Sequence, residues 1–307
     1  MTAPLHSREI KGKGRFYGRC SGTCPLGDQV LISVTNAQGV IAKPALVPAA
    51  VKVTAEKAWQ ALPRMVALSR ATGPSGCEKK RVADRCGNCR FCVTAEIKAE
   101  HRNVWDRAAD LGTSVHDYAH AHVLGEPRPY DERVEPFLTQ HLRFLDDHQV
   151  DLTQHIEAAE TTVWSARHGY AGTGDLWVWL TIDPATGKPH PRGKRFLWLV
   201  DIKTSMTKPV NVVYVDQVLQ LAALRYAEHA ILPDDFQVEV PKFAGTALLN
   251  LRTDDYALIP LPADRDAHRA FVNAVGLQTF LHAQDTKTWV PLEAPTAPAP
   301  ASNRKAS

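Results

Sequence analysis

The sequence predicts an α/β protein with a mixed central sheet flanked by helices. Three observations support this fold class. Strand-like segments follow one another at Thr161–Ser165, Gly174–Ile182 and Phe196–Thr204, and stretches with helical spacing stand before and after them. The strand-like segments are rich in Val, Trp, Leu and Thr, which suit a half-buried sheet. With 307 residues, 44% of them hydrophobic and 22% charged, the chain has the composition of a globular protein with a sizeable core.

The first half of the chain contains a short β segment and then helices. Residues 1–53 are punctuated by Gly and Pro, and apolar runs at Val30–Val34 and Gly39–Ile41 predict a small irregular β segment. A helix is expected from about Thr54 to Thr72. Apolar residues at helical spacing predict further helices at Trp105–Leu124 and Glu132–Asp147.

The second half is expected to complete the sheet. Gly and Pro residues between 187 and 193 turn the chain between the second and third strands. After these come an expected helix at Val213–Ala230, strands at Gly245–Leu251 and Tyr256–Ile259, and a helix at Asp264–Ala283. Residues 291–307 are rich in Ala and Pro and have no periodicity, so a disordered tail is expected there.

Charge divides the chain near Arg102. Residues 1–102 carry 17 Lys and Arg against 7 Asp and Glu, whereas the rest carries 19 against 26. We therefore expect a basic, Cys-rich, metal-binding module over 1–102, a core over 103–290 and the tail over 291–307. No apolar run of secretory or membrane-spanning length is present, so an intracellular, cytoplasmic protein without a membrane partner is expected.

Two carboxylates and a lysine stand on neighbouring predicted strands. Asp175 lies in GTGDLWVWL, and Asp201 and Lys203 lie in FLWLVDIKTS. Because side chains alternate along a strand, Asp201 and Lys203 share one face. Carboxylates among Leu, Trp and Val are costly to bury without a compensating cation. Their hard oxygens favour Mg²⁺ or Mn²⁺, an ion that can activate a bound water.

Three further positions give this pattern a family resemblance. Gln220 lies on the helix after the third strand, Gly112-Thr113-Ser114-Val115-His116 lies on an earlier helix, and Glu160 opens the strand before Asp175. In this order the residues resemble the RecB-like and Cas4-like branch of the PD-(D/E)XK nucleases, over roughly residues 105–230. The resemblance implies a restriction-endonuclease-like core.

The resemblance also implies roles for these residues. Asp175, Asp201 and His116 would bind Mg²⁺ or Mn²⁺, and Lys203 would serve the attacking water. Glu160 would support the metal site, and Gln220 would hold DNA or the geometry of the site. Leu224 stands where the family often has a tyrosine, and Tyr226, two residues further on, is the candidate DNA contact.

The expected activity is metal-dependent hydrolysis of DNA phosphodiesters. The resemblance favours an exonuclease in recombination, repair or phage DNA processing, acting in the host cytoplasm if phage-encoded. The sequence has no helicase motor, so a helicase or recombinase partner would be a separate chain. Basic residues near the cysteines are expected to follow DNA phosphates: Lys79, Lys80, Arg81, Arg85 and Arg90.

All six cysteines lie within the first 92 residues. Cys86, Cys89 and Cys92 are spaced to converge on one metal ion or cluster. Zinc and a 4Fe–4S cluster both need four ligands, and Cys77 is the simplest fourth. Cys20 and Cys24 could instead join Cys86 and Cys89. The nuclease resemblance adds an iron–sulfur option, so zinc and iron–sulfur both stay open.

Other readings of the sequence compete with the nuclease. His116-Asp117 resembles the paired residues of HD-type phosphohydrolases, with His101 as the upstream histidine, but that reading gives the β-rich region no role. A non-catalytic DNA-binding protein on a nuclease fold is a second alternative. Nucleotide binding through Gly172-Thr173-Gly174 lacks both the full fingerprint and a following helix.

Overall fold

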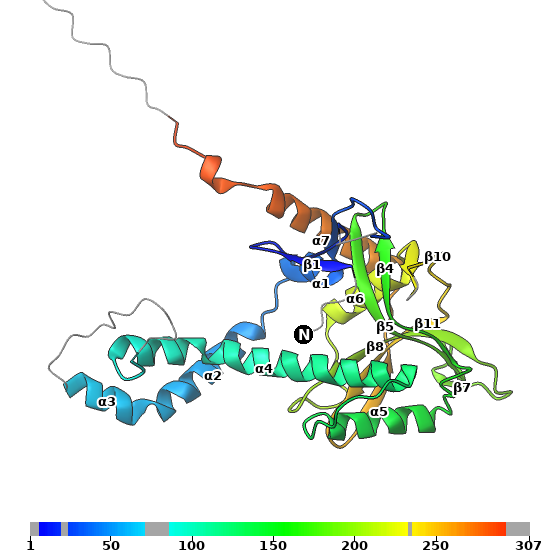
Figure 1. The fold of residues 1–307 in the computed structure, drawn as a ribbon, viewed down its shortest axis with the longest axis horizontal. Coiled ribbons are helices and arrows are strands. Elements are labelled where there is room, and N and C mark those ends of the chain that lie inside the picture. The colour runs from blue at the N-terminus through cyan, green and yellow to red at the C-terminus, as the bar shows by residue number, and fades with distance from the viewer. Residues whose placement is uncertain (1–5, 20–23, 71–85, 233–234, 293–307) are drawn as a thin grey trace, which may run out of the picture.

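The computed structural model describes residues 6–19, 24–70, 86–232 and 235–292. Within these ranges the chain is an α/β protein with a mixed sheet and helices on both faces, which confirms the fold class (Figure 1). The tail expected from residue 293 onward lies outside the described residues.

The main part of the sheet has the strand order β12-β11-β8-β5-β4-β9-β10. Strands β8 and β11 are parallel, and the other neighbouring pairs of this row are antiparallel. The strands span β4 (Ile156–Ser165), β5 (Tyr170–Leu180), β8 (Phe196–Thr204), β9 (His229–Ile231), β10 (Gln237–Glu239), β11 (Gly245–Leu251) and β12 (Tyr256–Pro260). A small hairpin, β6 (Ile182–Asp183) and β7 (Lys188–Pro189), stands apart.

The N-terminal strands join the same sheet. They are β1 (Ser7–Ile10), β2 (Gly14–Tyr17) and β3 (Leu31–Ser33). Strand β3 pairs with the start of β5, at Tyr170 and Ala171, whereas β8 pairs with its end, from Leu176 to Leu180. Because β4 occupies the other edge of β5, the segment 172–175 lies between β3 and β8. The sheet is therefore split at this point.

Helices cover both faces of the sheet. Leu199 of β8 packs with α6 (Val215–Arg225) and α7 (Arg265–Ala283), whereas its neighbour Val200 packs with α4 (Arg90–Leu124) and α5 (Glu135–Asp147). The alternation of a strand thus supplies two hydrophobic cores. Burial of one side chain such as Phe144 of α5, which is fully buried, contributes roughly 1.5–3 kcal/mol.

A helical arm extends from the sheet. It consists of α2 (Leu46–Gln60), α3 (Leu62–Arg70) and the first half of α4 (Figure 1). Lys57 of α2 and Arg64 of α3 each lie 3.0 Å from Glu96 of α4. The expected boundary at Arg102 lies inside α4, which continues onto the sheet, and β1–β3 belong to the sheet of the expected core.

Several expected elements differ from the structure. The run Gly39–Ile41 is not a strand, because a helical turn, α1 (Val34–Ala37), is capped by Ser33 and continues into the 3₁₀ turn η1 (Gln38–Val40). The expected helix 54–72 is two helices and begins eight residues earlier. The expected helix 213–230 ends at Arg225, because the next residues pair with β4 as strand β9. A 3₁₀ turn, η3 (Thr286–Thr288), follows α7. Among the described residues, no helix has the length and apolar character needed to cross a membrane.

Candidate active site

A cleft of about 360 Å³ opens where the sheet is split. It is lined from both helix layers, by α4 on one side and α6 on the other, and by strands β2, β4, β5 and β8. We call it the central cleft. Its lining includes all the residues of the predicted nuclease centre, which are His116, Glu160, Asp175, Asp201, Lys203 and Gln220.

Three potential metal ligands converge at one end of the cleft. His116 Nδ1 lies 3.4 Å from Asp175 Oδ2 and 3.9 Å from Glu160 Oε1. Asp175 is held in place because its Oδ2 accepts a 2.6 Å hydrogen bond from the Ile202 backbone N–H across the split. Glu160 has a φ of 48°, a left-handed conformation that is costly for a residue with a side chain. Strained backbone of this kind is concentrated at functional sites.

Asp201 and Lys203 lie beside this group. Lys203 Nζ is 2.5 Å from Asp201 Oδ2, as expected for residues on one face of β8. Gln220 of α6 donates a 2.7 Å hydrogen bond from Nε2 to Asp201 Oδ1. Asp201 is only 1% exposed, and its carboxylate is held by the Lys203 ammonium group and the Gln220 amide. The predicted metal-ligand set of His116, Asp175 and Asp201 thus differs from the closest cluster, in which Glu160 replaces Asp201.

Electrostatics couples these groups. Burial disfavours a charged His116, but Asp175 and Glu160 outweigh it and raise the pKa of His116 to about 10. Burial raises the pKa of Asp201 to about 6, although Lys203 opposes the change. Burial also acts against ionised Asp175, but His116 and Lys203 outweigh it and lower the pKa of this carboxyl. Near neutral pH the cleft therefore contains ionised carboxylates held by cationic neighbours.

The donor set fits a divalent cation. Ligand atoms of His116, Glu160 and Asp175 lie within 4.8 Å of one another. Asp201 Oδ2 is buried and has no well-aligned hydrogen bond among the described residues, although Lys203 is close. The carboxylate oxygens suit Mg²⁺ or Mn²⁺, and a ligating imidazole is neutral, so metal binding at His116 would release its proton.

Glycines allow the elements of the cleft to approach closely. A Cβ at Gly112 of α4 would lie 3.3 Å from Thr204 Oγ1 of β8. At Gly172 of β5 it would lie 2.8 Å from Val34 Cγ2 and 2.9 Å from Leu224 Cδ2. Gly172 thus serves close packing of α1 and α6 on the sheet.

Sequence reasoning did not single out every residue of the cleft. The hydroxyl of Tyr17 in β2 is hydrogen-bonded to Thr173 Oγ1 of β5 at 3.0 Å, and burial raises the pKa of Tyr17. Arg15 also lines the cleft. The signal available in the sequence was the alternation in Gly14-Arg-Phe-Tyr17, where Arg15 and Tyr17 share one face of a short strand.

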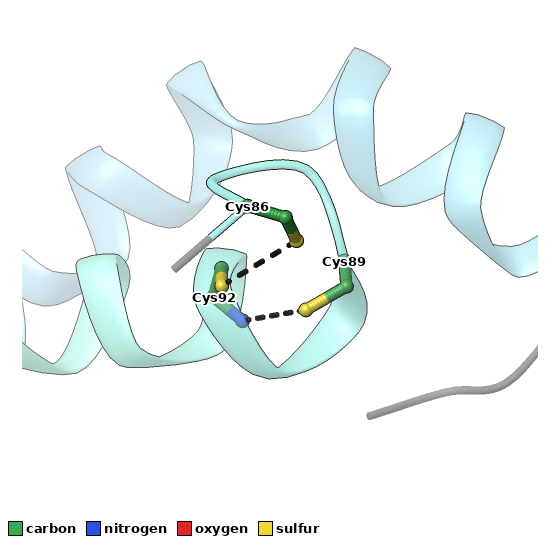
Figure 2. A group of neighbouring side chains, drawn as sticks. All are labelled: Cys86, Cys89 and Cys92. Atoms are coloured by element: carbon green, nitrogen blue, oxygen red, sulfur yellow. Dashed lines mark hydrogen bonds between the residues drawn. The ribbon is translucent and has the colours of Figure 1, made fainter. Parts of the chain in front are cut away.

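Three cysteines form a second cluster, at the far end of α4. Figure 2 shows Cys86, Cys89 and Cys92 facing one another where the helix begins. Cys89 is the N-cap, and its Sγ accepts a 3.4 Å hydrogen bond from Cys92 N, while the sulfurs of Cys86 and Cys92 are 3.8 Å apart. All three thiols lie within 4.8 Å of one another. At 1.5 Å per residue, Cys92 is about 36 Å from His116 along the helix.

The remaining predicted residues fall elsewhere. Cys24 is disulfide-bonded and packs near Leu26 and Trp164, away from the cysteine triplet. Arg90 is exposed at the first turn of α4. Tyr226 follows α6 and lines a different pocket from the central cleft. Outside the described residues lie Cys20, Cys77, Lys79, Lys80, Arg81 and Arg85.

Comparisons with known proteins add little to this geometry. No family model matches the chain. No curated protein matches it either. Among solved structures, the crystal structure of SSO0001 is 13% identical to it, over 57% of this chain and 86% of that one, with a TM-score of 0.27. A TM-score this low carries no argument for a shared fold or function.

Proposed function

We propose that the chain is a metal-dependent DNA nuclease with a PD-(D/E)XK core, acting as an exonuclease in DNA recombination, repair or phage DNA processing. One observation carries this proposal: His116, Glu160, Asp175, Asp201, Lys203 and Gln220 meet in a single cleft although they come from five separate elements. Three carboxylates close together, one of them fully buried, form a costly arrangement that a catalytic cation would explain.

The residues of the central cleft would have separate roles in hydrolysis. A bound Mg²⁺ or Mn²⁺ would lower the pKa of a water and neutralise charge on the phosphate. His116, Glu160 and Asp175 would hold it, and Asp201 would complete the site. Lys203, next to Asp201, would orient the attacking water and stabilise the developing negative charge. Gln220 would keep the Asp201 carboxylate turned toward the cleft.

The phosphohydrolase alternative meets a geometric obstacle. It needs His101 and His116 near one metal, but both lie on α4, fifteen residues apart. At 1.5 Å per residue this separation is about 22 Å, far beyond the reach of two ligands of one ion. His101 instead packs edge-to-face against Trp105, with ring centroids 5.2 Å apart. The non-catalytic DNA-binding alternative is decided by the activity assay.

Degradation of end-labelled linear DNA and of circular DNA tests the proposal. Each is incubated with the purified protein, with and without Mn²⁺ or Mg²⁺, beside folded Asp201→Ala and Lys203→Ala variants. We expect linear DNA to be lost only with metal, circular DNA to persist, and both variants to be inactive. Binding of DNA or RNA without any cutting would favour the non-catalytic alternative.

For the cysteine cluster we propose a structural zinc ion or a 4Fe–4S cluster, with Cys77 as the fourth ligand. Three thiols already face one another at the start of α4, about 36 Å from His116 along the helix, so the group would stabilise the arm and take no part in catalysis. Metal analysis with an anaerobic visible spectrum separates the options. A brown protein with iron and sulfide excludes zinc, and a colourless one with about one zinc per chain excludes the cluster.

A further inference from the structure

A second large pocket lies where α6 ends, outside the central cleft. Its volume is about 540 Å³, within the range of small-molecule sites. We call it the basic pocket, because four of its lining residues are cationic: Arg167, Arg225, Lys242 and Arg265. Buried Phe243 and His268 also line it.

Two cations of the basic pocket, Arg225 and Arg265, are held in position. Arg225 donates from Nη1 to the Ala263 carbonyl at 3.2 Å and from Nη2 to the Phe243 carbonyl at 2.9 Å. The Arg265 guanidinium lies 4.4 Å from the centre of the Tyr226 ring, and the Arg225 guanidinium lies 5.5 Å from it. A guanidinium fixed in advance loses little conformational entropy when it binds an anion.

The protein offsets only part of the positive charge of this pocket, because one carboxylate, Glu228, lines it beside the four cations. Within the part of the chain that the structure describes, no carboxylate lies within salt-bridge distance of these four cations. Glu228, the acidic residue in the lining, accepts hydrogen bonds from Ser165 Oγ at 3.1 Å and from the Arg167 backbone N–H at 3.4 Å. Four like charges around one hollow repel one another, and an anion relieves that repulsion.

We propose that the basic pocket binds the phosphate group of a nucleotide. A phosphomonoester carries nearly two negative charges at neutral pH, and its oxygens match the fork of an arginine. The pocket has room for the attached nucleoside.

The position of the pocket suggests which nucleotide it receives. Gln220 reaches the central cleft and Arg225 the basic pocket from the same helix, about 7.5 Å apart along its axis. The two sites thus share one helix, and the phosphate of a strand end, or of a released mononucleotide, is the candidate ligand. This assignment of the source rests on the proposed nuclease function, whereas phosphate binding itself does not.

Direct binding in EDTA tests the proposal, because the probes then stay intact whatever the nuclease activity. The probes are inorganic phosphate, deoxyadenosine 5′-monophosphate, and one single-stranded oligonucleotide with either a 5′-phosphate or a 5′-hydroxyl. Calorimetry follows the small probes and fluorescence anisotropy the oligonucleotides. The test variant is Lys242→Gln/Arg265→Gln, which changes exposed side chains only. The control is Arg269→Gln/Lys287→Gln, which removes the same charge outside the pocket.

We expect the phosphorylated oligonucleotide or the mononucleotide to bind about tenfold more weakly to the test variant, and the control to match the wild type. Preference for the 5′-phosphorylated over the hydroxyl oligonucleotide identifies the strand end as the source, and binding of the mononucleotide alone identifies the free nucleotide. Equal weakening in the two double variants would overturn the proposal. So would equal affinity of the test variant and the wild type for every probe. If the wild type binds the phosphorylated probes but cleaves no DNA, only the proposed nuclease function would be refuted.

Discussion

Buried His141 of α5 makes the stability of the protein sensitive to acid. The side chain is 0% exposed, and neither ring nitrogen has a hydrogen-bond partner among the described residues. Burial, assisted by His122 and His116, lowers the pKa of His141 to about 4, against 6.5 for an ordinary histidine. The folded protein therefore stays neutral at this position over a pH range in which the unfolded chain takes up a proton.

The sign and size of the effect follow from this difference. The contribution of neutral His141 to the free energy of unfolding is complete above the pKa of the unfolded chain, about 6.5, and is lost as the pH falls toward 4. By pH 5 the loss is about 2 kcal/mol, and below both pKa values it approaches about 3.4 kcal/mol. Replacement of His141 with leucine removes this titration, so the variant should lose about 2 kcal/mol less than the wild type between pH 7 and pH 5.

Urea unfolding at pH 7 and pH 5 measures the effect. The matched control is Gln140→Leu, which replaces a neighbouring buried polar side chain that cannot titrate, and it should retain the pH dependence of the wild type. If His141→Leu and the wild type lose equal stability between the two pH values, the assignment of His141 as a buried neutral base is refuted.

Three further predictions concern the supports of the central cleft. Gly172→Ala should destabilise the protein by about 1–3 kcal/mol in thermal unfolding, because its Cβ would meet Val34 and Leu224 below 3.0 Å, and an unchanged midpoint would contradict this packing. Arg252→Met should lower the free energy of unfolding, measured with urea, by about 2–4 kcal/mol. The buried guanidinium binds four backbone carbonyls, and three of them lie in the segment from Lys203 to Pro209. A decrease below about 0.5 kcal/mol would contradict that role. Gln220→Ala should lower the DNA cleavage rate about 10–100-fold with little change in stability, since it orients Asp201; equal rates would remove Gln220 from the site.

The sequence predicts the centre of the fold better than its margins. The strand at Phe196–Thr204 has the expected bounds, because its successive apolar residues are buried alternately in the two hydrophobic cores. The split of β5 between two partners depends on the docking of β3, a three-residue strand with no local signal of its parallel pairing. The sequence pattern does not predict the first half of α4. This half packs against α2 and α3 rather than the sheet, so the spacing of the apolar residues changes along the helix.

The site residues show the same division. Strand alternation places Asp201 and Lys203 together, and their contact follows from two positions of one strand. The approach of His116 and Glu160 to Asp175 is a tertiary outcome, expected only from a family resemblance. Tyr226, the candidate DNA contact, lies just beyond the end of α6 and lines the basic pocket, beside Arg265.

The nuclease proposal is tested most directly by the rate of cleavage of end-labelled linear DNA as free Mn²⁺ is increased. The wild type and a folded Asp175→Asn variant are compared, since this change keeps the size of the side chain and removes its charge. We predict a rate that rises and saturates with Mn²⁺ in the wild type, and a rate at least about 100-fold lower in the variant. Cleavage that is independent of Mn²⁺, or equal in the two proteins, would contradict a metal site built on Asp175.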